Sequence, residues 1–107
     1  MADSIFSVWT QKEQEVPSAS AFVADQIDFS SFLSAKYFVT YEAGGLSKTL
    51  LLSVRKKGVE VESIVTNKHG DPLDVAIDAV KTGSNLEIIV TNGTAFALRL
   101  LMARAKI

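Results

Sequence analysis

Apolar residues recur at every second position over most of the chain after residue 34, and this alternation constrains the fold more than any other feature. Residues 49–55, 59–62, 73–79 and 86–91 follow it. A period of two is typical of strands with one buried face, whereas an amphipathic helix repeats about every 3.6 residues. Short strands separated by Gly, Asn, Asp and Pro are typical of antiparallel folds. The sequence therefore predicts a single all-β domain, an antiparallel β-sandwich that is jelly-roll-like or immunoglobulin-like.

The same alternation predicts which of the three aromatic residues in SAKYFVTYEAGG, residues 34–45, point into the core. Tyr37 and Tyr41 fall on the inward row and Phe38 on the outward row, so we expect both tyrosines to be core residues. The complete set of predicted inward rows is Tyr37, Val39 and Tyr41; Leu50, Leu52 and Val54; Val59 and Val61; Leu73, Val75, Ile77 and Ala79; Leu86, Ile88 and Val90; and Phe96, Leu98, Leu100 and Met102.

Turn residues predict how the rows pair, because a slip of one residue would send every side chain to the other face. Two-residue loops at 44–45 and 57–58 keep the apolar rows together. The expected pairs are Val39 with Leu50 and Tyr37 with Leu52 across the first loop, and Val54 with Val61 and Leu50 with Val65 across the second. A two-residue Asn-Gly turn near residue 92 would separate the rows. We therefore predict a three-residue loop, 91–93, with Gly93 left-handed and Ile88 opposite Phe96.

Composition limits the class of protein. The 107 residues are enough for one ordinary core, and the chain contains no cysteine, which excludes disulfides and thiolate chemistry. The formal net charge is −1, so no general electrostatic attraction to nucleic acid is expected. The first 17 residues do not resemble a signal peptide, and no segment approaches the roughly 20 apolar residues of a membrane helix. We expect a soluble protein, made in the cytoplasm, that binds neither nucleic acid nor membrane.

No constellation of residues predicts catalysis. His69, the only histidine, lies in a turn-forming segment, 67–72, and has no second His or Cys at ligand spacing. Asp74 and Asp78 are spaced about 13 Å apart along a strand, too far to share a calcium ion. We therefore expect no catalytic, cofactor-binding or metal-binding residues, and no enzyme activity.

The outward rows of the last two predicted strands are unusually apolar. They contain Ile89, Ala97, Leu101, Ala103 and Ala105, interrupted by Glu87, Thr91 and Arg99. An apolar face of this kind needs a cover. Either the N-terminal segment of the chain packs over it, or it contacts another subunit, in which case Trp9, Ile89, Arg99, Leu101 and Ala103 form the interface. The edge of the final strand could also pair with a neighbouring chain.

Several segments resemble a small all-β module of tailed-bacteriophage virion structural proteins. They are Asp28-Phe29 leading to Ser34-Ala35-Lys36-Tyr37, the Gly-Gly hairpin, the strands 49–56 and 73–80, and the pair NLEIIVTN and FALRL, residues 85–92 and 96–100. The similarity covers roughly residues 25–107. The chain departs from the pattern at Arg55-Lys56-Lys57-Gly58, where relatives more often have a His-Asp-Gly type of turn.

This resemblance implies a non-enzymatic structural subunit of a phage particle: a tail, neck, fibre or capsid-decoration component located in the virion. Its partners would be other virion structural proteins and copies of itself, in a trimer or larger ring. Residues 25–107 would form the sandwich, and residues 1–24 an N-terminal arm or edge strand. In the arm, Ile5, Phe6, Val8 and Trp9 would dock on a neighbouring protein. The alternative is a carbohydrate- or receptor-binding module that presents Trp9, Phe38 and a tyrosine to sugar rings.

Overall fold

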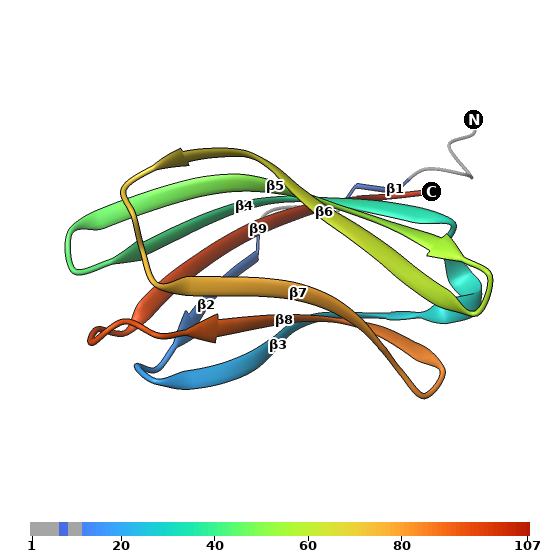
Figure 1. Ribbon diagram of the computed structural model, residues 1–107, viewed down its shortest axis with the longest axis horizontal. Helices are drawn as coiled ribbons and strands as arrows, with labels where there is room; N and C mark the ends of the chain where they lie inside the picture. Colours follow the sequence, from blue (N-terminus) through green and yellow to red (C-terminus); the bar gives the residue numbers. More distant parts are fainter. Residues whose placement is uncertain (1–6, 9–11) are drawn as a thin grey trace.

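The computed structural model describes residues 7–8 and 12–107, which form an all-β sandwich of two antiparallel sheets (Figure 1). The strands are β1 (Ser7–Val8), β2 (Lys12–Val16), β3 (Ser20–Asp28), β4 (Ser34–Ala43), β5 (Leu46–Lys57), β6 (Glu60–Gly70), β7 (Val75–Thr82), β8 (Asn85–Asn92) and β9 (Leu98–Lys106). The large sheet has the order β1-β9-β4-β5-β6, with β2 also paired to β9, and the small sheet has the order β3-β8-β7. The predicted antiparallel β-sandwich is confirmed.

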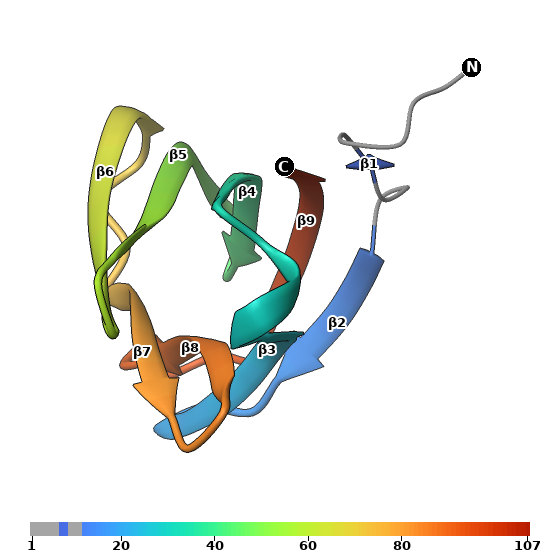
Figure 2. The same cartoon turned by 90° about the vertical axis from the view of Figure 1, so that its right-hand side faces the viewer.

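The core lies between the two sheets, which face each other in Figure 2. Most of the predicted inward rows are buried, from Tyr37, Val39 and Tyr41 in β4 to Leu98, Leu100 and Met102 in β9. Phe96 is an exception, with 58% of its surface exposed. It precedes β9 and lies against the first glycine of the 44–45 loop, where an added Cβ would come within 2.7 Å of the phenyl ring.

The first predicted hairpin is confirmed residue by residue. Val39 lies opposite Leu50, Tyr37 opposite Leu52, and Ala43 opposite Leu46 across the Gly44-Gly45 loop. Both glycines have positive φ, 59° and 82°, as the favoured two-residue hairpin turn requires.

In the second predicted hairpin the loop lies one residue later than expected, and the strand pairing is therefore shifted by two residues. The loop is Gly58-Val59, so Val54 lies opposite Ser63 and Leu52 opposite Val65. Gly58 takes the first loop position with φ 64°, a conformation that glycine adopts at little cost. A shift of two keeps every side chain on its predicted face, but it turns Val59 into a loop residue that is 75% exposed.

The third predicted hairpin does not exist. β8 pairs with β3 and β7, while β9 pairs with β4 in the other sheet, so residues 93–97 cross between the sheets. Gly93 does not adopt a positive φ. Both edges of β8 are already occupied, which leaves β9 no place beside it.

A buried asparagine holds this crossing in place. Asn92 is fully buried, and its side-chain amide nitrogen lies 3.1 Å from the carbonyl oxygen of Val16 and 2.8 Å from that of Phe96. Its side-chain oxygen accepts hydrogen bonds from the backbone N–H and the hydroxyl of Thr94, at 3.0 and 2.7 Å. The residue that resembled a turn signal is therefore a polar link between the end of β2 and the start of β9.

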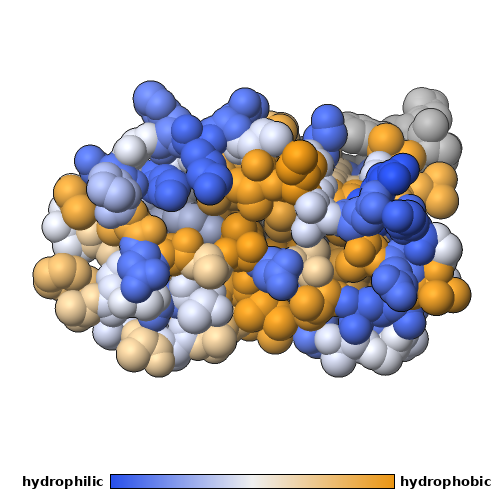
Figure 3. All heavy atoms as spheres, viewed as in Figure 1, coloured by the Kyte–Doolittle hydropathy of each residue, from blue (hydrophilic) through white to orange (hydrophobic). Residues whose placement is uncertain are grey.

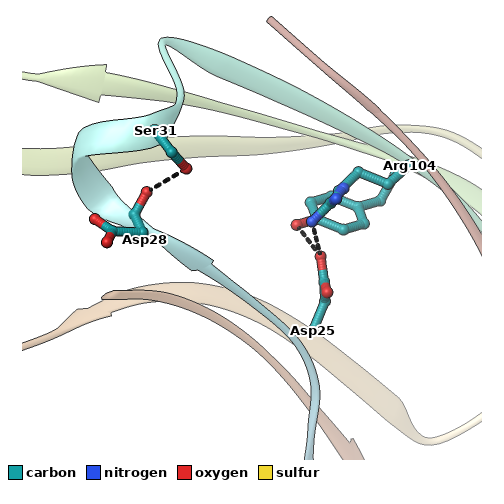
Figure 4. A network of polar contacts seen from close by, with 5 residues as sticks. Asp25, Asp28, Ser31 and Arg104 are labelled. Carbon is teal, nitrogen blue, oxygen red and sulfur yellow. Dashed lines mark hydrogen bonds and ion pairs between the residues drawn. The ribbon is translucent and has the colours of Figure 1, made fainter. Parts of the chain in front are cut away.

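A second polar link joins the sheets through the core. The carboxylate of Asp25, in β3, lies 3.1 Å from the Arg104 guanidinium of β9 and accepts a 2.7 Å hydrogen bond from the Tyr37 hydroxyl. Figure 4 shows Asp25 and Arg104 pointing toward each other. The two charged side chains are only 9% and 17% exposed. Asp25 follows an irregularity in the β3–β8 register, between Val23 and Asp25.

Between β3 and β4 the chain changes sheets through a short 3-10 helix, Phe29–Ser31. The Asp28 carboxylate accepts hydrogen bonds from the Ser30 backbone N–H and hydroxyl, at 3.0 and 2.8 Å, and these bonds lower the pKa of Asp28. Within the described ranges, no helix is long and apolar enough to cross a membrane.

The N-terminal part of the described chain belongs to both sheets. β2 pairs with β9 at the edge of the large sheet, and Val16 is fully buried in the core. β3 pairs with β8 in the small sheet and spans the expected boundary between residues 24 and 25.

Candidate interaction surface

The outer face of the large sheet, on the side away from the core, contains a hollow of about 450 Å³. Alternate residues of three neighbouring strands supply its side chains, because their inward neighbours fill the core. The lining side chains on this face are Phe38 and Thr40 from β4, Thr49 and Leu51 from β5, and Leu101 and Ala103 from β9, with Asn67 from β6. We call this the outer hollow.

Phe38 is the dominant apolar group of the outer hollow. It lies directly opposite Leu51 on one side and Ala103 on the other, and 56% of its surface is exposed. The cost of exposing a phenyl ring makes such a position a preferred contact for another molecule.

Asn67 reaches the rim of the outer hollow because β6 is irregular there. The β5–β6 register shifts between Thr49 and Leu51, and Asn67 has φ 54°, an uncommon left-handed conformation that asparagine tolerates. The sequence assigned residues 67–72 to a turn, so it missed both the bulge and the contribution of Asn67 to this surface.

A second hollow of about 570 Å³ lies on the same outer face, toward the β5–β6 turn. Its side chains include Lys36, Arg55 and Glu62 together with Ile64, which is 61% exposed. The Glu62 carboxylate lies 3.0 Å from the Lys57 ammonium and 2.7 Å from the Arg55 guanidinium. Hydrogen bonds from Lys57 and then Arg55 lower the pKa of Glu62. At this end of the face, charged side chains therefore lie beside an exposed apolar residue, Ile64.

The structure brings only part of the expected interface together. Leu101 and Ala103 line the outer hollow, and Arg99 lies on the same face, 3.1 Å from the Glu42 carboxylate. Ile89 lies on β8, on the outer face of the small sheet at the opposite side of the sandwich. Since the expected β8–β9 hairpin does not form, these residues do not make one surface.

The expected docking arm falls mostly outside the described residues. Ile5, Phe6 and Trp9 are not described, and for Val8 the backbone alone is, paired with Ala105 of β9. The expectation that the edge of β9 is open to a neighbouring chain is wrong, because β9 has β4 on one side and β1 and β2 on the other.

Two of the aspartates considered as metal ligands bind backbone N–H groups, and the histidine lies on a strand. Asp71 accepts a 3.0 Å hydrogen bond from the Ser47 backbone N–H, and Asp78 accepts one of 2.9 Å from the N–H of Ala79. His69 is exposed at the end of β6, not in a loop. Among the described residues, no three His, Asp or Glu side chains are grouped so as to hold a metal ion.

Both tyrosines are fully buried, as the alternation predicted, and so neither can form an exposed sugar platform. Burial, and then the hydrogen bond to Asp25, raise the pKa of Tyr37; burial raises that of Tyr41. Because the folded pKa values lie above the unfolded value of about 10, the stability that these neutral phenols contribute is complete below that pH and is lost above it.

We therefore expect the folded protein to show no phenolate absorbance near pH 10, and both tyrosines to ionise only when alkali unfolds the chain. An absorbance titration followed in parallel by circular dichroism measures this. Reversible ionisation of either tyrosine near pH 10 in a chain that keeps its strand signal would contradict the buried placement.

The fold has a counterpart among solved structures. The crystal structure of the tailspike protein of Acinetobacter baumannii phage AM24 is similar, with a TM-score of 0.60 and 7% sequence identity, over 97% of this chain and 26% of that chain. No protein-family model and no curated protein matches the sequence. The chain thus spans about a quarter of the tailspike chain that it resembles, and at this identity the similarity is one of fold.

Proposed function

We propose that this protein is a non-enzymatic structural component of a bacteriophage particle that docks on a neighbouring virion protein through the outer hollow of its large sheet. The main observation in support is the exposed Phe38 ring, which lies between Leu51 and Ala103 on the side of the sheet away from the core. The fold it shares with part of a phage tailspike supports the virion setting. The expected arm, with Ile5, Phe6, Val8 and Trp9, would add a second contact, and the protein would also associate with copies of itself.

The charge pattern of the outer face suits docking in one orientation. The apolar centre around Phe38 excludes water, while the Arg55–Glu62–Lys57 cluster at one end and the Arg99–Glu42 pair at the other leave charged rims. An apolar centre with a polar rim is the common organisation of protein interfaces.

Replacing Phe38 with aspartate tests the docking surface. We expect F38D to be nearly absent from purified particles when it is produced during infection in place of the wild-type chain, because it places a charge at the centre of an apolar contact. The matched control is V23D, since Val23 is a similarly exposed apolar residue, at 44%, on the outer face of the small sheet. Both variants should keep the wild-type melting temperature, and incorporation of F38D at the wild-type level would overturn the proposal.

The arm requires a shorter truncation than its predicted length suggests. Deleting residues 1–20 would remove β2, whose Val16 is part of the core. Deleting residues 1–11 removes β1 but leaves β2 complete. A loss of incorporation in that variant, at an unchanged melting temperature, would therefore report docking and not unfolding.

A carbohydrate- or receptor-binding module is the second candidate, because Phe38 is surrounded by groups that can bond sugar hydroxyls. Thr40, Thr49 and Asn67 line the same hollow as its ring. Under this alternative the wild-type protein binds members of a glycan panel and F38A does not. Absence of binding to any glycan, together with the loss of F38D from particles, selects the docking function.

A further inference from the structure

One side of the sandwich has an open strand edge in each sheet. β6 ends the large sheet and β7 ends the small sheet, and neither has a further neighbour within the described part of the chain. The two strands lie together at the front of Figure 1 and at the left of Figure 2. We call this side the β6–β7 side. It is distinct from the outer hollow.

Apolar side chains lie between these two edges. Val61 and Val65 of β6, and Val75 and Ile77 of β7, pack against the core but are only partly buried. Figure 3 shows apolar residues gathered across the middle of this side. Apolar surface between two unpaired strand edges is suited to association with another protein chain.

The exposed edge of β6 is regular over residues 60–66, before the bulge near Asn67 interrupts it. In a two-residue hairpin the pair that flanks the loop, here Lys57 and Glu60, is hydrogen-bonded, and such pairs alternate along the strands. The N–H and C=O groups of Val61, Ser63 and Val65 therefore point away from β5. These groups could therefore form hydrogen bonds with a further strand that lies alongside β6.

The charges along β6 favour an antiparallel copy of the same strand as that partner. Glu60 and Glu62 lie at its start, and Lys68 and His69 at its end. Glu60 and Lys68 form no ion pair with other described residues. When two copies pair in opposite directions about Ser63, Glu60 of each strand lies opposite Thr66 of the other, next to the segment that carries Lys68. The acidic start of each strand then lies near the lysine at the end of the other.

We propose that two copies of this chain associate through the β6–β7 side, with β6 pairing antiparallel to β6 of the second copy about a two-fold axis at Ser63. In this register Val61 of each copy lies opposite Val65 of the other, on the side that faces the seam between the sheets. The large sheets of the two copies become continuous.

The size of this side is sufficient for a stable dimer. The molecule measures 41 by 31 Å in the plane of Figure 1, viewed down its 21 Å axis. Covering about two thirds of that outline would bury roughly the 800 Å² per partner found in ordinary specific interfaces. The two-fold axis produces a dimer, in place of the trimer or larger ring expected from the sequence.

A single cysteine at the two-fold axis tests the register. The chain contains no cysteine, so S63C introduces the only thiol, and Ser63 is an exposed residue to which this substitution is conservative. Directly opposed hydrogen-bonded residues have Cα atoms about 5.5 Å apart, within the range of about 4.4–6.8 Å that a disulfide spans. Mild oxidation should convert most of S63C to a covalent dimer.

The matched control is S84C, because Ser84 is an exposed serine in the β7–β8 turn, away from the axis. We expect it to remain monomeric on denaturing gels. Equal cross-linking of S63C and S84C would overturn the proposal, since it would indicate random collision.

Mass measurement provides a second test. Light scattering should give the wild-type protein twice the 11.6 kDa of the chain. S63K places two lysines against each other at the axis and should weaken the dimer by at least about tenfold, whereas S84K should not. A monomeric wild-type protein, or an S63K variant that is as dimeric as the wild type, would overturn the proposal.

F38D should remain dimeric, so failure of docking and failure of self-association can be told apart.

Discussion

Replacing Asn92 with alanine is expected to lower the free energy of unfolding by about 3 kcal/mol, because buried polar groups would lose their partners. The Val16 carbonyl loses its hydrogen bond to the Asn92 amide, and the backbone N–H of Thr94 loses its acceptor. The site is fully buried, so water does not easily replace the missing groups. Chemical denaturation measures this loss, and the dependence of the free energy of unfolding on denaturant concentration should be unchanged.

Asn85 provides the control, since it occupies the opposite end of the same strand and is only half-buried. N85A should cost less than about 1 kcal/mol. If N92A is as stable as N85A, Asn92 does not hold the crossing between the sheets, and the account of residues 93–97 is wrong.

Replacing Asp25 with alanine is expected to cost about 3–5 kcal/mol, because the Arg104 guanidinium would remain almost buried without its carboxylate. Arg104 and Tyr37 both bond the same oxygen of Asp25, at 3.1 and 2.7 Å, so the loss affects two strands of the large sheet. The double variant D25A/R104M should be less destabilised than the sum of the single variants, since it leaves no unpaired charge.

The exposed pair Glu42–Arg99 has the same separation of 3.1 Å, but its side chains are 49% and 50% exposed. E42A should therefore cost no more than about 1 kcal/mol. Equal losses for D25A and E42A would show that burial does not decide the contribution of these ion pairs.

The parts of the fold that depend on local pattern could be predicted from the sequence. Alternation assigned Tyr37 and Tyr41 to the core and Phe38 to the outer face, because a strand can bury only one of its two faces. The 44–45 loop was predictable for a similar reason, since two consecutive glycines suit one short turn.

The parts that depend on distant contacts could not be predicted in this way. The Asn92-Gly93 sequence is a strong local turn signal, yet the groups that bind the Asn92 side chain include the carbonyls of Val16 and Pro17, 76 and 75 residues away. The same error placed Ile89 and Leu101 on one outward face, although their strands belong to different sheets. Asn67 entered the outer hollow through a bulge that the composition of residues 67–72 does not reveal.

The buried ion pair was also missed for a physical reason. Asp25 and Arg104 are 79 residues apart, and each stands in a segment without a clean apolar alternation on both sides. Charged residues are normally exposed, so a sequence reading assigns them to the surface unless their partners are known. Only the packing of β3 against β4 and β9 brings the two groups together.

Electron microscopy of phage particles labelled with an antibody against this chain tests the virion role most directly. We expect label at one fixed position on particles pelleted from a lysate of the source, on the tail, the neck, a fibre or the capsid surface. Particles without label, in a lysate that contains abundant free protein, would contradict a structural role in the virion.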